Sequence, residues 1–366
     1  MTGPEVVVVG AGPAGSATAL QLARCGVSVS VVTAPHQRRG PHGEVLKAVA
    51  EPSLRRLGVW ELFLALDLPP SRGIVSAWGS ESLAEWSSIW NPYGDGWTVD
   101  RPAFDRLLLE CAREAGSGLV EGRVLDAQSS AGRWRITART QLGVVELEPT
   151  LVIDATGRSV WLGRRMGEHR LVDRLIGVLR RYRCRRSPEP VLTVEAAEDG
   201  WWYAVPAPVG ELVVVHMTDA DLWSTRDWDR RLAKTRLIRR LCEGAAPVRG
   251  EVVRPAYSVR TVLDLPGALA VGDACLAVDP LSSDGLCFSL VSALEAAAVV
   301  PALLEGDARP RQRYEEGADR VFARYLERRE AVYGLERRWP TAPFWARRRQ
   351  CHTREGPAPY ISKMSA

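Results

Sequence analysis

The first 33 residues carry the pattern that most restricts how this chain can fold. The short β-branched run Val6–Val9 leads into Gly10-Ala11-Gly12-Pro13-Ala14-Gly15, and an apolar periodicity predicts a helix over Ser16–Cys25. A second β-branched strand is expected over Val27–Val32. Strand, G-x-G-x-x-G, helix and strand in this order predict a βαβ unit that binds a dinucleotide.

The residues of the glycine-rich loop have separate tasks in such a unit. Gly10 makes the tight turn, Gly12 lets the backbone approach a pyrophosphate, and Gly15 allows the helix to pack closely on the strand. Pro13 and Ala14 open the helix, whose first N–H groups point at the phosphates. The alternative is a glycine-rich turn without a ligand, and the surrounding strands and helix argue against it.

The end of the second strand departs from the dinucleotide-binding pattern. This strand usually ends in Asp or Glu, which hydrogen-bonds a ribose hydroxyl, whereas here the position is Thr33. A threonine hydroxyl can still bond the ribose, but it carries no charge. The alternative is that Thr33 is only a strand-end residue. We therefore expect the site to persist with weaker affinity for its cofactor.

Three later segments carry residues that suit the same site. Gly272-Asp273 follows a short buried strand, and a turn then leads into a helix predicted over Cys287–Val300. Leu151–Asp154 is another buried strand that ends in a turn, and a further helix is predicted over Phe104–Glu114. The candidate cofactor residues in and beside these segments are Arg101, Val124, Gly157, Gly272, Asp273, Pro280, Gly285 and Leu286.

Together these motifs resemble the FAD-dependent monooxygenases of the p-hydroxybenzoate hydroxylase fold, a superfamily that also contains flavin-dependent halogenases and geranylgeranyl reductases. The chain is most similar to one branch, the flavoproteins that hydroxylate a peptidyl tryptophan during the maturation of quinone cofactors. Gly43-Glu44, Gly200-Trp201-Trp202-Tyr203 and the tail Trp339-Pro340 with Phe344-Trp345 carry this resemblance. It extends over nearly the whole chain.

The expected fold class is α/β, with a Rossmann-like FAD-binding domain, an antiparallel β-sheet substrate domain and C-terminal helices. We expect the FAD-binding domain to be discontinuous, comprising residues 1–70, 98–165 and 255–310. Residues 71–97 and 166–254 read as strands with aromatic faces and are expected to form the sheet over the flavin. Residues 311–366 are expected to form a charged helix and a tail that packs through Phe344 and Trp345 and then frays.

The resemblance implies that NADPH or NADH reduces the FAD, or that a partner reductase delivers reduced flavin. Oxygen then adds to the reduced flavin and gives a C4a-hydroperoxide. That species hydroxylates an electron-rich aromatic substrate, such as a free, peptidyl or carrier-bound tryptophan. Glu44 and His42 are the candidate acid–base residues. Trp201, Trp202 and Tyr203 are candidates for an aromatic wall against a flat substrate. Arg39 is a candidate for contacting phosphate or the reducing cofactor. For each, the alternative is a surface charge or ordinary packing.

Three other functions remain open. A flavin-dependent dehydrogenase or reductase would need the same FAD motifs. A tryptophan halogenase would need a lysine between flavin and substrate, and the strand expected near Gly73–Gly79 has none, although Lys47 lies near Glu44. In Trp201–Pro206 only the first Trp and the final Pro of the halogenase W-x-W-x-I-P segment are kept. A flavin-binding protein without turnover is the third alternative, and Thr33 motivates it.

Composition excludes several function classes. The net charge is +4 and arginine is spread along the chain, which argues against a nucleic-acid binder. No apolar run approaches the ~20 residues of a membrane-spanning helix, so no membrane role is expected. Seven cysteines without CxxC or Cys/His spacing argue against a metal site or a disulfide framework and favour the cytoplasm. His216, on an alternating strand, is expected to be a core histidine.

Overall fold

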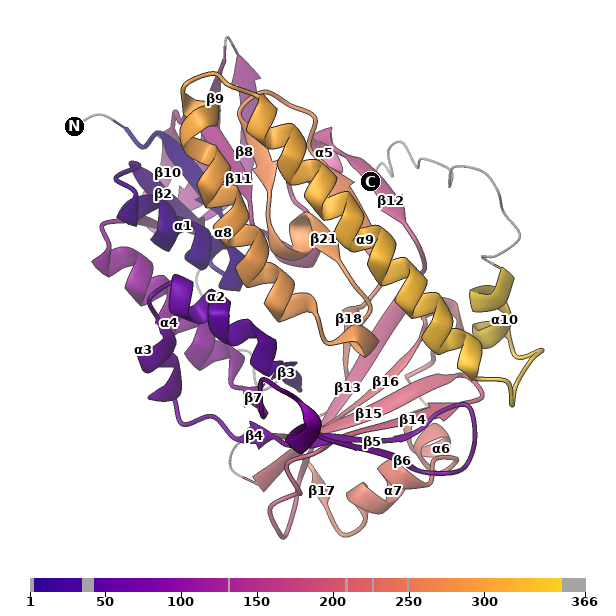
Figure 1. The fold of residues 1–366 in the computed structure, drawn as a ribbon. Helices are drawn as coiled ribbons and strands as arrows, with labels where there is room; N and C mark the ends of the chain where they lie inside the picture. Colours follow the sequence, from indigo (N-terminus) through magenta and orange to yellow (C-terminus); the bar gives the residue numbers. More distant parts are fainter. Residues whose placement is uncertain are drawn as a thin grey trace.

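The computed structural model describes residues 3–34, 43–130, 132–207, 210–225, 227–248 and 250–350. Two large sheets lie toward opposite ends of the molecule, and the long helix α9 (Arg309–Leu335) runs diagonally from one to the other (Figure 1). The short helix α10 (Pro343–Gln350) packs beside the far end of α9. The predicted α/β class is confirmed, as is the predicted C-terminal helix.

The first large sheet is built around β1, in the order β10-β9-β8-β2-β1-β11-β20. From β8 to β20 neighbouring strands are parallel, whereas β8, β9 and β10 form an antiparallel meander. The bounds are β1 (Val6–Val9), β2 (Val29–Thr33), β8 (Gly118–Ser130), β9 (Arg133–Thr140), β10 (Gly143–Leu147), β11 (Leu151–Asp154) and β20 (Ala268–Ala270). Every residue of β1 and β11 is buried, which explains their uninterrupted apolar runs. Both strands are confirmed as predicted.

Helices cover this sheet and form the largest core with it. Helix α1 (Pro13–Arg24) packs against α4 (Arg101–Glu114) and α8 (Gly285–Leu304). Helix α1 begins three residues earlier than predicted, because proline has a preset helical φ and needs no N–H partner in a first turn. Among the described residues, α8 alone is long and apolar enough to cross a bilayer by length and composition, and half of its apolar window is buried inside the protein.

The second large sheet has the order β17-β13-β16-β15-β14-β5-β6, with β18 also paired to β13. Its strands are β5 (Gly73–Ala77), β6 (Ala84–Ser87), β13 (Leu175–Arg183), β14 (Leu192–Ala197), β15 (Gly200–Ala207), β16 (Glu211–Asp219), β17 (Ala246–Pro247) and β18 (Val252–Pro255). The prediction of a wholly antiparallel sheet is wrong at one pair, since β14 and β5 are parallel. No hairpin joins these two strands: the chain between them passes through the first sheet, so their relative direction is not tied to antiparallel.

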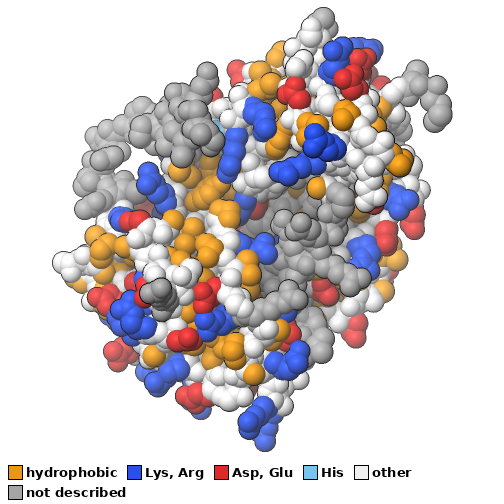
Figure 2. Space-filling view, turned by 180° about the vertical axis from the view of Figure 1, so that it is seen from behind, with side chains coloured by type: hydrophobic (Ala, Val, Ile, Leu, Met, Phe, Trp, Pro, Cys, Tyr) orange, Lys and Arg blue, Asp and Glu red, His pale blue; other side chains and the backbone are white. Residues whose placement is uncertain are grey.

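Two three-stranded sheets complete the fold. One contains β3 (Glu44–Leu46), β7 (Gly96–Val99) and β4 (Pro70–Ser71), and the other contains β12 (Glu168–Leu171), β19 (Val259–Val262) and β21 (Leu276–Ala277). The predicted domain boundaries stay a prediction, and several of them fall inside an element, such as β4, β7, β18 and α9. On the back of the molecule, Figure 2 shows acidic and basic side chains intermingled among apolar ones.

The aromatic residues of β15 pack on both faces of the second sheet. Trp201 belongs to a cluster with Phe344 and Trp345 of α10, whereas Trp202 packs with Trp228 of α6 (Trp228–Leu232) on the opposite face. This separation follows from the alternation of side chains along a strand. The prediction that Trp202 lines one wall with Trp201 and Tyr203 is therefore wrong. The prediction that Phe344 and Trp345 anchor the tail is confirmed, since both are buried. The predicted fraying beyond Gln350 lies outside the described residues.

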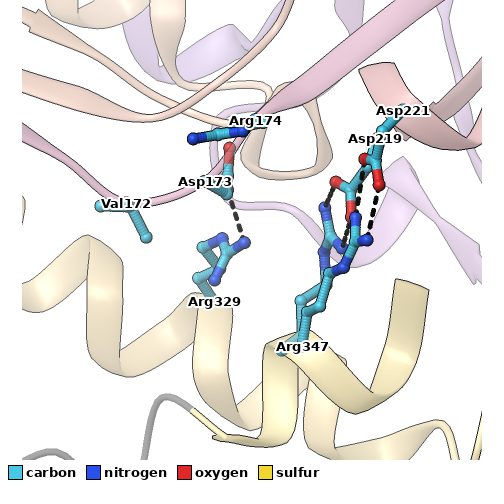
Figure 3. A pocket seen from close by; sticks show the side chains of 8 residues that line it. Val172, Asp173, Arg174, Asp219, Asp221, Arg329 and Arg347 are labelled. Carbon is cyan, nitrogen blue, oxygen red and sulfur yellow. Dashed lines mark hydrogen bonds and ion pairs between the residues drawn. The ribbon is translucent and has the colours of Figure 1, made fainter. Parts of the chain in front are cut away.

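Ion pairs fasten the C-terminal helices to the second sheet. Asp219, at the end of β16, accepts hydrogen bonds from Arg348 at 2.8 Å and from Arg347 at 2.9 Å, both on α10. Arg329 on α9 donates to Asp173 at 2.6 Å. These pairs line a pocket of about 350 Å³, in which Arg329 of α9 points toward Asp173 and Arg347 of α10 toward Asp219 (Figure 3). Each of the three aspartates that line this pocket, Asp173, Asp219 and Asp221, is paired with an arginine.

We expect Asp219→Asn to lower the free energy of unfolding by about 3–5 kcal/mol, because it leaves the buried Arg348 guanidinium without its counter-charge. Urea unfolding at neutral pH measures the change. Asp221→Asn is the matched control: that aspartate also pairs with α10, but its side chain is 56% exposed, so about 1 kcal/mol or less is expected. Equal losses in the two variants would contradict the assignment of the buried pair.

His216 is confirmed as a core residue on the face of the sheet opposite to Trp201. Its ring stacks on Trp202 with centroids 4.3 Å apart, and its Nε2 lies 3.5 Å from Oδ1 of Asp199. Burial lowers the pKa of His216, an effect that Asp199 only partly offsets and that the Arg231 charge reinforces. The imidazole is therefore neutral in the folded protein at pH values where the unfolded chain takes up a proton.

Stability is expected to fall as the pH drops below about 6.5, because the unfolded chain then binds a proton that native His216 does not. The slope contributed by one such group approaches about 1.4 kcal/mol per pH unit. In His216→Phe, which keeps an aromatic ring against Trp202, this part of the slope should vanish between pH 6.5 and 5. Part of the slope persists, because burial also lowers the pKa of His169. If the free energy of unfolding changed with pH by the same amount in the wild-type protein and in His216→Phe, His216 would not be the source of this slope.

Candidate functional site

The glycine-rich loop between β1 and α1 is shaped by close backbone contacts. Gly10 has a φ of +111°, and a Cβ there would lie 2.4 Å from the carbonyl oxygen of Ala155. A Cβ on Gly15 would lie 2.0 Å from the carbonyl oxygen of Gly10. At Gly12, by contrast, a Cβ would meet nothing within 4 Å. The loop is therefore tight against the protein at Gly10 and Gly15 and open at Gly12, which fits a ligand lying over the middle glycine.

The N-terminus of α1 points into that open space. Gly12 is its N-cap and offers no side-chain acceptor, and no acidic residue lies in the first turn. Pro13 and Ala14 are buried against the sheet. The free N–H groups and the positive end of the helix dipole are thus left for an anion from outside the chain. A pyrophosphate suits this arrangement.

The second motif packs directly on the first. Gly272, after β20, has a φ of +56°, and a Cβ on it would lie 2.6 Å from the Cβ of Ala14. Its N–H donates to the Ser292 hydroxyl of α8 at 2.9 Å. Asp273 follows in a 3-10 turn and forms an ion pair with Arg158 at 3.2 Å. The two motifs therefore share one edge of the first sheet, as the sequence predicted for a common site.

Arg158 joins the third motif to this site, and we did not foresee its role from the sequence. It follows Gly157, and besides pairing with Asp273 it donates to the carbonyl oxygens of Tyr257 at 2.7 Å and Val278 at 2.6 Å. Its position directly after the turn glycine is the signal that pointed to it. Burial raises the pKa of Asp273, and the Arg158 charge opposes that rise.

The turn before α8 is held from two sides. Pro280 opens a 3-10 turn, Pro280–Ser282, and α8 begins at Gly285 and Leu286. Lys47 donates to the carbonyl oxygen of Ser282 at 2.6 Å and pairs with Asp284 at 2.7 Å. The dipole of α8 consequently points its positive end across this turn.

On the other side of the turn, a buried hydrogen-bond chain reaches the second sheet. The Trp201 indole N–H donates to the hydroxyl of Tyr333 at 3.0 Å, and that hydroxyl donates to Oδ2 of Asp279 at 2.5 Å. Asp279 is fully buried and accepts the N–H of Leu281 at 2.9 Å. Burial raises the pKa of Asp279, and the charge of Arg329 opposes that rise.

Glu44 and Arg101 form the charged centre of the site. The Arg101 guanidinium contacts the Glu44 carboxylate at 2.5 Å and that of Asp105 at 3.1 Å. Burial alone would lower the pKa of Arg101, but the two carboxylates raise it overall, so the guanidinium stays charged. The side chain of Glu44 is 34% exposed, which leaves part of its carboxylate accessible. Sequence reasoning singled out Glu44 and Arg101 but missed Asp105, one helical turn along α4.

Tyr203 lies beside this charged centre. Burial raises the pKa of its hydroxyl, and the negative charge of Glu44 raises it further. The Tyr203 ring is half-buried, while Trp201, with ring centroids 5.8 Å apart, is only 1% exposed. Gly43 fits closely against the same sheet, since a Cβ on it would lie 2.8 Å from the Val213 side chain. Tyr203 thus presents aromatic surface near Glu44, and Trp201 supports it from within the core.

The remaining predicted residues lie around the same sheet edge. Thr33 is half-buried at the end of β2, and Val124 is buried in β8 next to a bulge in its pairing with β9. Arg39 and His42 lie outside the described residues. A search of the described residues for clusters of His, Cys, Asp and Glu able to hold a metal ion finds none.

Comparison with known families divides the chain into two matched parts. A family model described as tryptophan halogenase matches residues 84–365, and one described as glucose inhibited division protein A matches residues 5–72. Among curated sequences, the chain is 28% identical over 375 residues to LodB of Marinomonas mediterranea, named as an FAD-dependent oxidoreductase by inference; the match covers 94% of this chain and 96% of that one. It is 25% identical over 382 residues to a tryptophan 2-halogenase of Chondromyces crocatus, covering 96% and 72%.

Solved structures show the same likeness. The flavin-dependent halogenase CmlS superposes with a TM-score of 0.84 at 25% identity, covering 95% of this chain and 68% of that one. The peptidyl tryptophan dihydroxylase QhpG superposes with a TM-score of 0.79 at 26% identity, covering 95% and 79%. Together with the open Gly12 loop, these matches show an FAD-binding oxidoreductase with the fold of flavin-dependent halogenases.

Gly12→Val should give a folded protein without FAD, because a side chain there enters open space that the pyrophosphate needs. Gly15→Ala should instead destabilise the fold, because its Cβ would collide with Gly10. The flavin absorbance of the purified proteins and the melting temperatures of the apoproteins separate the two effects. Full flavin content in Gly12→Val would show that the pyrophosphate lies elsewhere.

Proposed function

The chain belongs to the tryptophan halogenase family, and we propose that it is an FAD-dependent monooxygenase that hydroxylates an electron-rich aromatic ring, the indole of a free or peptide-borne tryptophan. The observation that carries this proposal is the half-exposed Glu44 carboxylate, held by Arg101 beside the Tyr203 ring. The similarity to a peptidyl tryptophan dihydroxylase over 95% of the chain supports the choice of substrate.

FAD, once reduced, supplies the activation of oxygen, and the loop of Gly10, Gly12 and Gly15 with Asp273 would hold it. The protein's own side chains position the aromatic ring of the substrate and accept the proton that it loses. Tyr203 offers a flat surface for an indole, because aromatic rings pack in offset or edge-to-face contacts. Glu44, whose Oε2 is held by Arg101 and whose side chain is 34% exposed, is the proposed acceptor of the proton that leaves the ring when it regains aromaticity.

Halogenation is the second candidate, and one observation favours it. Lys47 is an amine at the turn before α8, where its Nζ bonds the carbonyl oxygen of Ser282. Two observations disfavour it: the Nζ is already engaged by Asp284, and β5 carries no lysine, with Val75 at its centre. An ammonium that is already paired is poorly placed to hold a halogen. We therefore favour hydroxylation.

NADPH or NADH is the proposed electron donor, with reduced flavin from a partner reductase as the alternative. Anaerobic addition of NADPH to the holoenzyme distinguishes them, since bleaching of the flavin shows direct reduction. We also propose that the enzyme works in the cytoplasm, because the six described cysteines are free thiols.

The product separates the two candidates directly. N-acetyltryptophanamide and a tryptophan-containing peptide are incubated with holoenzyme, reductant and isotope-labelled dioxygen, with and without bromide. Hydroxylation predicts labelled oxygen in the product whether or not bromide is present. A brominated indole would overturn the proposal in favour of halogenation, and consumption of reductant without product on either probe would count against an indole substrate.

Glu44→Gln should lower the rate of hydroxylation by about 10²–10⁴-fold, the usual contribution of a positioned acid–base group, while FAD stays bound. Glu61→Gln, an exposed glutamate on α3 (Trp60–Leu64), is the matched control and should retain full activity. The readouts are product formation and flavin absorbance. Undiminished hydroxylation in Glu44→Gln would remove Glu44 from the reaction.

A further inference from the structure

The strand that should end in a ribose-binding acid ends in Thr33. Its hydroxyl makes one long hydrogen bond, at 3.3 Å, to the carbonyl oxygen of the next residue, Ala34. A hydroxyl that bonds the ribose without a charge is the weaker partner, since charge-assisted hydrogen bonds are about twice as strong as neutral ones. If the adenosine ribose is held by a carboxylate, that carboxylate must come from another strand.

The other carboxylates at this edge of the first sheet are already engaged. Asp154, at the end of β11, accepts hydrogen bonds from the hydroxyl of Thr156 at 2.6 Å and from the N–H of Leu162 at 2.8 Å. Asp273 pairs with Arg158. Both also lie on the far side of β1 from β2. Neither one can take the place of an acid at the end of β2.

Strand β8 lies on the other side of β2 and brings a glutamate level with Thr33. The two strands are parallel, and Glu121 is the direct partner of Thr33 in their register. Residues level with each other on neighbouring strands point to the same face, and the strands lie about 4.8 Å apart, a gap that a glutamate side chain spans. Glu121 is exposed, and no ion pair or side-chain hydrogen bond ties it to any other described residue.

We propose that Glu121 supplies the carboxylate that Thr33 lacks and binds the 2′-hydroxyl of the FAD adenosine ribose, with Thr33 as a secondary partner. Two features of β8 support this placement. A Cβ on Gly122 would lie 2.8 Å from the carbonyl oxygen of Arg139, so the strand is closely fixed at this point. Beyond it, the pairing with β9 is interrupted after Val124, and such bulges often re-aim a strand beside a binding site.

The test is a titration of full-length apoprotein with FAD and with an FAD analogue whose adenosine ribose is 2′-deoxy. The wild-type protein should bind FAD about tenfold more tightly than the analogue, as expected for loss of one charge-assisted hydrogen bond. Glu121→Gln should bind the two nearly equally and lose about tenfold for FAD. Glu146→Gln, an exposed glutamate on β10 of the same sheet, should behave as wild type.

Two further variants keep the assignment falsifiable. Adding Thr33→Glu to Glu121→Gln should restore tight binding and the preference for FAD, because it returns the acid to β2. Thr33→Val alone should keep most of the preference, and it carries the test if Glu121→Gln misfolds. A preference that survives in Glu121→Gln, or that disappears in Thr33→Val, would overturn the proposal. No outcome depends on whether the enzyme hydroxylates, because only cofactor binding is measured.

Discussion

The close approach of three backbone segments at one edge of the first sheet is the constraint on which the site depends. Gly10 leaves no room for a side chain against Ala155, and Gly15 leaves none against Gly10. Gly272 meets Ala14 in the same way. These contacts bring the ends of β1, β11 and β20 together around the N-terminus of α1. They leave Gly12 between them, where a Cβ would meet no atom within 4 Å and a cofactor phosphate can approach the backbone.

Buried hydrogen bonds connect the second sheet to this edge of the first sheet, whereas the apolar cores of the two sheets form separate clusters. Asp279 sits on the turn before α8, Tyr333 on α9 and Trp201 on β15, and two hydrogen bonds connect the three. Because a buried carboxylate without partners is costly, this chain constrains where α9 and the sheet can sit relative to the turn. The face of the second sheet that carries Trp201 and Tyr203 is thereby fixed relative to the turn before α8.

The sequence predicted the parts of the fold that depend on local pattern. The runs of β1 and β11, the glycine-rich loop and α9 need only neighbouring residues to be recognised. The parallel pair β14–β5 was missed, because strand direction between segments distant in sequence depends on the path of the intervening chain. Arg158 was missed as a site residue for a similar reason: its three partners lie on segments about a hundred residues away. The burial of Trp201 likewise depends on residues distant in sequence, since its ring packs near Trp78 and its N–H bonds Tyr333 of α9.

Thr33 and Glu121 show how a binding group can move between strands while the site keeps its chemistry. Positions on parallel neighbours that share a register are close in space although they are 88 residues apart along the chain. The sequence of β2 alone shows that the acid is absent at Thr33, whereas the pairing of β2 with β8 brings the Glu121 carboxylate beside that position. The same reasoning applies to the reaction: the fold supplies the scaffold for the cofactor, and in the proposed function single side chains such as Glu44 on β3 determine the chemistry. Membership of a halogenase family therefore leaves the chemistry to be settled by the residues that face the substrate.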